Sequence, residues 1–122
     1  IDMKRSPDIV PTLAIVSAFA KEPTKIYNIE TLRFKETDRL SAVANELSKI
    51  GCKVEEGSDY LIIVPGKLKG AKIETYKDHR MAMSFAVVGL FVNGIKICDP
   101  DCVSKSYPNF WKDFSKISRG IN

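Results

Sequence analysis

Several residue types that mark particular classes of site are scarce in this sequence. It has one histidine and three cysteines among 122 residues. Cys52, Cys98 and Cys102 are odd in number and form no Cys-x-x-Cys pair, so they indicate free thiols in a reducing compartment rather than a disulfide framework. A single histidine without a cysteine or histidine cluster gives poor support for a metal centre. We therefore expect no bound metal.

Long apolar runs and glycine-rich loops are also missing. The longest apolar run, Ala82–Val92, is interrupted by Ser84 and Gly89 and is too short to span a bilayer. No nucleophile elbow or glycine-rich phosphate loop occurs. What is present is 44% hydrophobic residues, enough for one core, and a net charge of +4. That charge suits a polyanion binder, and it equally suits a pocket for small phosphorylated or carboxylated substrates.

The hydrophobic pattern predicts an α/β fold. Apolar residues recur on one side of a helix from Leu40 to Ile50, and Gly51 is a usual helix stop. Leu13–Ala20 and Arg80–Phe91 are apolar on nearly every side, so we expect two helices, the first buried all round with Asp8 at or near its cap. Strands are expected at Thr24–Asn28, Lys53–Glu56, Tyr60–Val64, Ala71–Thr75 and Ile95–Cys98, and a last helix from Phe110 to Ile117.

A shift of 70 positions maps the first half of the chain onto the second. It carries Asp8 onto Asp78 and Lys35 onto Lys105. It also carries the apolar helix positions 40, 44 and 47 onto 110, 114 and 117. One structural unit used twice would place equivalent loops at the same end of both units, although any alternation of strands and helices can produce such matches by chance.

The most charged stretch, residues 33–39, runs into the start of the helix at Leu40. A helix N-terminus favours anions, and Lys35 and Arg39 add full positive charges there. Glu36 adds a group able to carry a proton. If the repeat is real, this loop converges with Asp8, His79, Arg80 and Lys105. Such a pocket predicts a substrate with at least two anionic groups, and the carboxylates of Asp8 and Glu36 could exchange protons with it.

Each of these motifs also has a purely structural explanation. In the charged stretch Thr37 or Asp38 could cap the helix while Glu36 complements its dipole. Asp78-His79-Arg80 could likewise be a helix cap with a surface arginine. A basic module that binds RNA or DNA is a rival function. It is weakened because acids are interleaved with the cations and no aromatic and basic residues alternate on a strand.

Three segments together resemble the C-terminal part of the 5-enolpyruvylshikimate-3-phosphate synthase family. They read L-R-F-K-E-T-D-R at 32–39, Y-K-D-H-R-M-A-M at 76–83 and D-P-D-C-V-S-K-S-Y-P at 99–108, with Pro7-Asp8 at the place of the family's P-D element. The pair K-E-[ST]-D-R and D-H-R-M-A-M is specific. The alternative family, the UDP-N-acetylglucosamine enolpyruvyl transferases, shares the fold but lacks this pair.

The resemblance implies a particular architecture. The family has two domains, each of three βαβαββ units in which buried small-residue helices pack against mixed sheets. This chain would hold about two units, residues 1–65 and 66–122, as the C-terminal part of the C-terminal domain, with the N-terminal domain absent. The start Ile1-Asp2-Met3-Lys4 is neither a signal peptide nor a natural first segment, so we expect a fragment or an excised domain.

The resemblance also implies an activity. The family transfers the enolpyruvyl (carboxyvinyl) group of phosphoenolpyruvate to the 5-hydroxyl of shikimate 3-phosphate and releases phosphate, in aromatic amino acid (chorismate) biosynthesis, with no metal or organic cofactor. We thus expect a cytoplasmic, monomeric transferase whose partners are these two small molecules, with no nucleic acid and no membrane. The 122-residue chain alone is expected to be inactive, because the other domain supplies most of the shikimate phosphate site.

The same likeness assigns a role to each residue of the predicted pocket. Asp8 would be the base near the shikimate hydroxyl, Lys35 would contact the same substrate, and Glu36 would exchange the proton at the methylene carbon of phosphoenolpyruvate. Thr31 stands where many members carry a shikimate-binding asparagine. The remaining roles concern phosphoenolpyruvate: its carboxylate would be held by Arg39 and Arg80 and its phosphate by Lys105, with His79 as a supporting neighbour.

Overall fold

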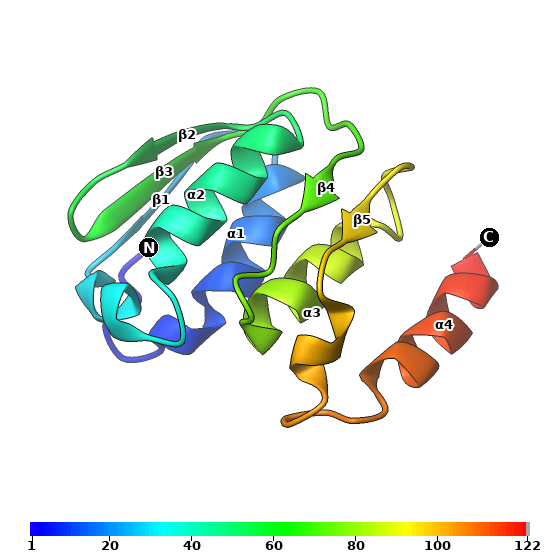
Figure 1. The fold of residues 1–122 in the computed structure, drawn as a ribbon. Helices are drawn as coiled ribbons and strands as arrows, with labels where there is room; N and C mark the ends of the chain where they lie inside the picture. Colours follow the sequence, from blue (N-terminus) through cyan, green and yellow to red (C-terminus); the bar gives the residue numbers. More distant parts are fainter. Residues whose placement is uncertain (122) are drawn as a thin grey trace.

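The structure, a computed structural model, describes the backbone of residues 1–121 and the side chains of residues 1–118. Its elements alternate between helices and short strands, so the expected α/β fold is confirmed (Figure 1). None of the described helices is long and apolar enough to cross a membrane. In chain order the elements are η1 Pro7–Ile9, α1 Val10–Ala18, β1 Thr24–Tyr27, η2 Glu30–Phe34, α2 Arg39–Lys49, β2 Lys53–Glu56, β3 Tyr60–Val64, β4 Lys72–Ile73, α3 His79–Val88, β5 Lys96–Ile97, η3 Pro100–Val103 and α4 Phe110–Ile121.

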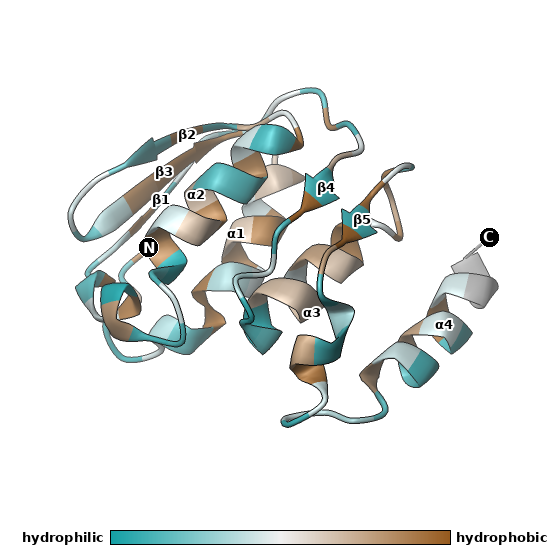
Figure 2. Ribbon diagram, in the orientation of Figure 1, coloured by the Kyte–Doolittle hydropathy of each residue, from teal (hydrophilic) through white to brown (hydrophobic). Residues whose placement is uncertain are grey.

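The larger sheet has the antiparallel order β1-β3-β2. Its hairpin, β2 and β3, has the predicted bounds, because alternation of apolar residues and a three-residue turn are both local signals. Along β3, Leu61 and Ile63 are fully buried while their neighbours are partly exposed. Helices α1 and α2 lie together over the face to which these side chains point (Figures 1 and 2).

Helix α2 forms for the reasons that its sequence indicates. Its apolar stripe, from Leu40 through Leu47 to Ile50, is completely buried. Asp38 caps the helix by accepting a hydrogen bond from the backbone N–H of Ser41 at 3.2 Å. The chain leaves the helix through Gly51 at φ +112°, where a Cβ would also collide with the carbonyl oxygen of Lys67.

The expectation that the first long helix is buried all round is wrong. Helix α1 is open on one side, where Val16 is 61% exposed, while α3 is buried at most positions and its most exposed apolar residue, Val87, is 41% exposed. The two helices pack against each other, α1 also contacts α2 and β3, and α3 also contacts η3, β5 and α2. Asp8 lies next to the cap of α1, as expected, but does not form it. It lies within η1, and the residue before α1 is Ile9, which has no side chain able to accept a hydrogen bond.

The order of elements follows the 70-residue shift. Moved by 70 positions, α1 falls on α3, β1 reaches β5, η2 falls on η3 and α2 falls on α4. The isolated parallel bridge between Asp2 and Tyr27 corresponds to the parallel pairing of β4 with β5. As a result, the starts of α1, α2 and α3 lie at the same end of the molecule, at the bottom of Figure 1. This end holds the candidate site.

Candidate active site

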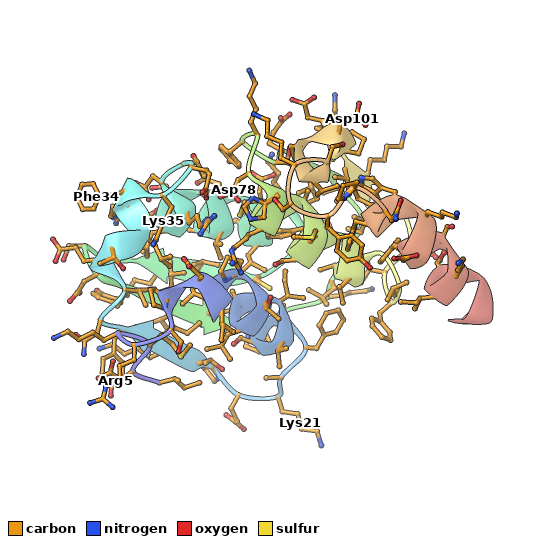
Figure 3. The ribbon with its side chains drawn as sticks, turned by 90° about the horizontal axis from the view of Figure 1, so that it is seen from below. Arg5, Lys21, Phe34, Lys35, Asp78 and Asp101 are labelled. Atoms are coloured by element: carbon orange, nitrogen blue, oxygen red, sulfur yellow. The ribbon has the colours of Figure 1, made fainter. Side chains whose placement is uncertain are left out.

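Helix caps set the positions of the charged side chains at this end. Asp38 caps α2, which makes Arg39 its first residue. Asp78 caps α3 by accepting from the backbone N–H of Arg80 at 2.9 Å, which makes His79 and Arg80 the first residues of that helix. The capping explanation of both motifs is therefore confirmed. Figure 3, seen from this end, labels Lys35 before α2 and Asp78 before α3.

The guanidinium of Arg39 is the centre of the site. Its side chain is 2% exposed, and it forms a two-point pair with the fully buried Asp78, Nε to Oδ2 at 2.6 Å and Nη2 to Oδ1 at 3.2 Å. Nη1 donates to Asp8 at 3.2 Å, and Nη2 also binds Glu36. Burial alone would lower the pKa of Arg39, but the hydrogen bonds and negative charges of these carboxylates outweigh it and raise the pKa. Arg39 is therefore charged at every accessible pH.

Two further cations border Asp8. The Nζ of Lys35 lies 3.5 Å from Asp8 Oδ1, and the Nη1 of Arg80 donates to the backbone carbonyl of Asp8 at 3.3 Å. Arg39 already uses four of its five N–H groups on protein carboxylates. Arg80, in contrast, makes only that one side-chain hydrogen bond within the described part of the chain. Lys35 and Arg80 are thus better able than Arg39 to bind an added anion.

Arg80 also lines the groove between α1 and α3. This groove has a volume of 280 Å³ and includes Asp8, Thr12 and Ser84 at its polar edge. The hydroxyls of Thr12 and Ser84 lie 3.5 Å apart across it. A small anionic molecule at this edge would meet the free guanidinium N–H groups of Arg80.

Glu36, Asp78 and His79 bring possible metal ligands close together. One ligand atom from each lies within 4.8 Å of the others. Arg39 binds both carboxylates, however, so a metal ion would have to displace a guanidinium that already neutralises them. The group of charges fits anions bound beside Arg39 better than it fits a cation in its place.

Two residues of the predicted site lie in other pockets. Lys105 follows η3 and lines a cavity of 340 Å³ with Lys77, Asp99, Asp101 and Cys102. Thr31 lies in η2 and lines a cavity of 240 Å³ that includes Asn28 and Asp59. Within the described residues, no hydrogen bond or ion pair joins either of them to Arg39. The structure thus brings together Asp8, Lys35, Glu36, Arg39, His79 and Arg80.

Sequence reasoning placed Asp78 beside the site but assigned it no role there. Its position before a helix indicated a cap, and the structure adds that the same carboxylate holds Arg39. Arg33 was also missed. It joins η2 to the hairpin through Asp38, Glu56 and the carbonyls of Gly57 and Ser58. A sequence shows that a carboxylate or an arginine is present, but not which distant group it faces.

Known proteins share this arrangement of elements. A sequence model described as EPSP synthase (3-phosphoshikimate 1-carboxyvinyltransferase) matches residues 1–114. The chain belongs to the EPSP synthase family. It is 52% identical over 117 residues to the 3-phosphoshikimate 1-carboxyvinyltransferase of Nostoc punctiforme and 48% identical over 118 residues to that of Methanopyrus kandleri, covering 96% of this chain in both cases.

A solved structure gives the same result for the fold. The EPSP synthase from Acinetobacter baumannii superposes on 93% of this chain with a TM-score of 0.84 and 32% identity, and the match covers 27% of that chain. The chain also spans only 28% of the length of the Nostoc and Methanopyrus proteins. The family resemblance carried by the K-E-T-D-R and D-H-R-M-A-M motifs is therefore confirmed, for about a quarter of an EPSP synthase.

Proposed function

We propose that the whole protein containing this chain transfers the enolpyruvyl group of phosphoenolpyruvate to the 5-hydroxyl of shikimate 3-phosphate and releases phosphate. The observation that carries the proposal is the group around Arg39, where acids and cations from η1, the loop before α2 and the start of α3 meet. Family membership supports it. The chain alone is expected to be inactive, since it would supply only one side of the substrate site.

The reaction is an addition followed by an elimination. Addition across the enol double bond requires one proton to be delivered to the methylene carbon and another to be removed from the attacking hydroxyl. Elimination then removes a proton from that same carbon while the C–O bond to phosphate breaks, which releases phosphate and restores the double bond. Glu36 is assigned the exchange of the proton at the methylene carbon, and Asp8 is assigned the removal of the proton from the hydroxyl. Glu36 and Asp8 are separate carboxylates held on different N–H groups of Arg39, which keeps their oxygens apart and lets them act on different atoms.

The cations are assigned to the substrate charges. Lys35, beside Asp8, would contact shikimate 3-phosphate, while Arg39, Arg80 and Lys105 would hold phosphoenolpyruvate. Because Arg39 has only one unused N–H, on Nη1, a substrate carboxylate must take that N–H or displace Asp8 or Glu36. Arg80 can bind without such an exchange. Positioning and neutralising two anionic substrates in this way would supply most of the rate. His79 would support the site through its place beside Glu36 and Asp78.

The remaining assignments follow from the same proposal. Residues 1–65 and 66–122 would be two units at the C-terminal end of the C-terminal domain, and the whole protein would be a cytoplasmic monomer. Its partners would be the two small anions rather than nucleic acid or a membrane, since the most buried cation of the site is occupied by carboxylates. Thr31 would take the place of the shikimate-binding asparagine.

The proposal is tested by Glu36→Gln in the full-length protein, with phosphate release measured in the presence of both substrates. We expect turnover to fall by about 10²–10⁴-fold, the usual contribution of a general acid or base. The melting temperature should stay within a degree or two, because the side chain of Glu36 is 51% exposed and its ion pair adds little stability. Glu22→Gln, at an exposed loop position after α1, is the matched control. Wild-type turnover in Glu36→Gln would refute the assigned role.

A further inference from the structure

Glu46 is a buried carboxylate that the proposed chemistry does not use. It lies on α2, seven residues after Arg39, and is fully buried. Its Oε1 accepts the backbone N–H of Glu74 at 2.8 Å and the Nζ of Lys49 at 2.7 Å. Its Oε2 accepts the hydroxyl of Tyr76 at 2.7 Å. A buried carboxylate is stable only when its oxygens accept hydrogen bonds or ion pairs. Here the partners other than Lys49 come from the segment just before Asp78.

That segment has an unusual backbone. Tyr76 and Lys77 have φ values of 57° and 55°, so two consecutive residues with side chains adopt the left-handed conformation. Non-glycine residues adopt it at a cost and keep it only where their surroundings hold them. The chain then turns at Asp78, whose N–H donates to the carbonyl of Thr75 at 2.8 Å, and enters α3. The direction of α3 therefore depends on this turn.

Helix α2 thus holds the start of α3 at two points. The first is the pair between Arg39 and Asp78, and the second is the contact of Glu46 with Glu74 and Tyr76. Seven residues of helix separate the two points by about 10 Å on one side of α2. Two points of attachment fix the orientation of the start of α3 relative to α2, whereas with one point alone α3 could rotate about it. Because Arg80 is the second residue of α3, its guanidinium moves with that orientation.

We infer that Glu46 and Tyr76 are positioning residues that hold Arg80 in register with Arg39. Neither residue is assigned a contact with substrate. They act by fixing the turn before α3 to helix α2, whose first residue is Arg39. The kinetic part of this inference rests on the proposed function. Its structural part, the ordering of residues 75–83 by the hydroxyl of Tyr76, does not.

The test is Tyr76→Phe in the full-length protein, which removes one hydroxyl and leaves Glu46 its contacts with Glu74 and Lys49. We expect the KM for phosphoenolpyruvate to rise about tenfold, since small displacements of a binding group are costly. The kcat should change by less than about threefold. The KM for shikimate 3-phosphate should rise less than that for phosphoenolpyruvate, because its assigned contacts, Asp8, Lys35 and Thr31, lie outside the turn and only Asp8 contacts Arg80. Amide hydrogen exchange over residues 75–83 should become faster.

The matched control is Tyr60→Phe. It also removes a tyrosine hydroxyl bound to a glutamate, Glu55 at 3.0 Å, but on the hairpin. It should change neither KM nor the exchange of residues 75–83. Glu46→Ala removes both contacts with the turn and should exceed the effect of Tyr76→Phe. If the Glu46→Ala variant does not fold, the Tyr76→Phe variant alone still tests the inference.

The outcomes separate the two claims. Unchanged exchange over residues 75–83 in Tyr76→Phe would overturn the inference, whatever the kinetics. Faster exchange with both KM values raised equally would also overturn it, because the effect would then be a general loss of structure. Failure of the wild-type protein to turn over the two substrates would remove the proposed function, while the exchange result would still decide whether the turn is held by Tyr76.

Discussion

The substitution Arg39→Met tests the central feature of the site, a buried arginine held by three carboxylates. Methionine keeps the length and apolar stem of the side chain and removes the guanidinium. Among the described residues, the fully buried carboxylate of Asp78 would then keep a single hydrogen bond, the 2.9 Å contact with the backbone N–H of Arg80. We expect the full-length protein to lose stability, because a carboxylate would be stranded without its partner.

The magnitude follows from the exposure of the three acids. Breaking a buried ion pair by removing one partner costs about 3–5 kcal/mol, and this applies to Asp78. The side chains of Asp8 and Glu36 are 46% and 51% exposed, so their pairs with Arg39 add only about 0–1 kcal/mol each. The expected loss in the free energy of unfolding is therefore about 3–5 kcal/mol, almost all of it from Asp78.

Urea unfolding of the full-length protein measures this loss, with Arg33→Met as the matched control. Arg33 makes at least as many hydrogen bonds, but its side chain is 22% exposed and its partners Asp38 and Glu56 are 41% and 29% exposed. We expect about 1–2 kcal/mol from that substitution. Asp78→Asn should recover part of the loss in the Arg39→Met background, because it removes the stranded charge. The reasoning is refuted if Arg39→Met costs no more than Arg33→Met.

Two other predictions concern the backbone and pH. Gly51→Ala should lower the free energy of unfolding by more than about 1 kcal/mol, because Gly51 has φ +112° and a Cβ would meet the carbonyl of Lys67. Urea unfolding checks this, and an unchanged midpoint would contradict it. Burial and the hydrogen bond to Glu46 raise the pKa of Tyr76 to about 12 from its ordinary value of 10. The stability that this hydroxyl adds should thus be complete below pH 10 and lost as the pH rises toward 12. The difference in stability between wild type and Tyr76→Phe, measured from pH 8 to 11.5, should shrink above pH 10. A constant difference would count against the bond to Glu46.

Local signals predicted the parts of the fold that neighbouring residues determine. The hairpin was predicted to the residue, since Gly57-Ser58-Asp59 sets the turn and alternation sets the strands. Helix α2 was predicted within one residue, because its apolar stripe and its end at Gly51 are both visible in the sequence. The burial of α1 on all sides was predicted wrongly, since Val16 is 61% exposed. Composition reports how apolar a helix is, but not whether another element lies against each face.

The motifs and the 70-residue spacing, which the sequence determined by itself, were enough to establish the family and to place the charged segments at one end of the fold. Which charges meet was decided only by the tertiary structure. The pairing of Arg39 with Asp78 joins residues 39 positions apart, and the contact of Glu46 with Tyr76 joins residues 30 apart. Neither follows from a local pattern, because the direction of each side chain depends on how two helices pack. That packing makes Arg39 a saturated centre, and it leaves Arg80 and Lys35 as the cations open to an anion.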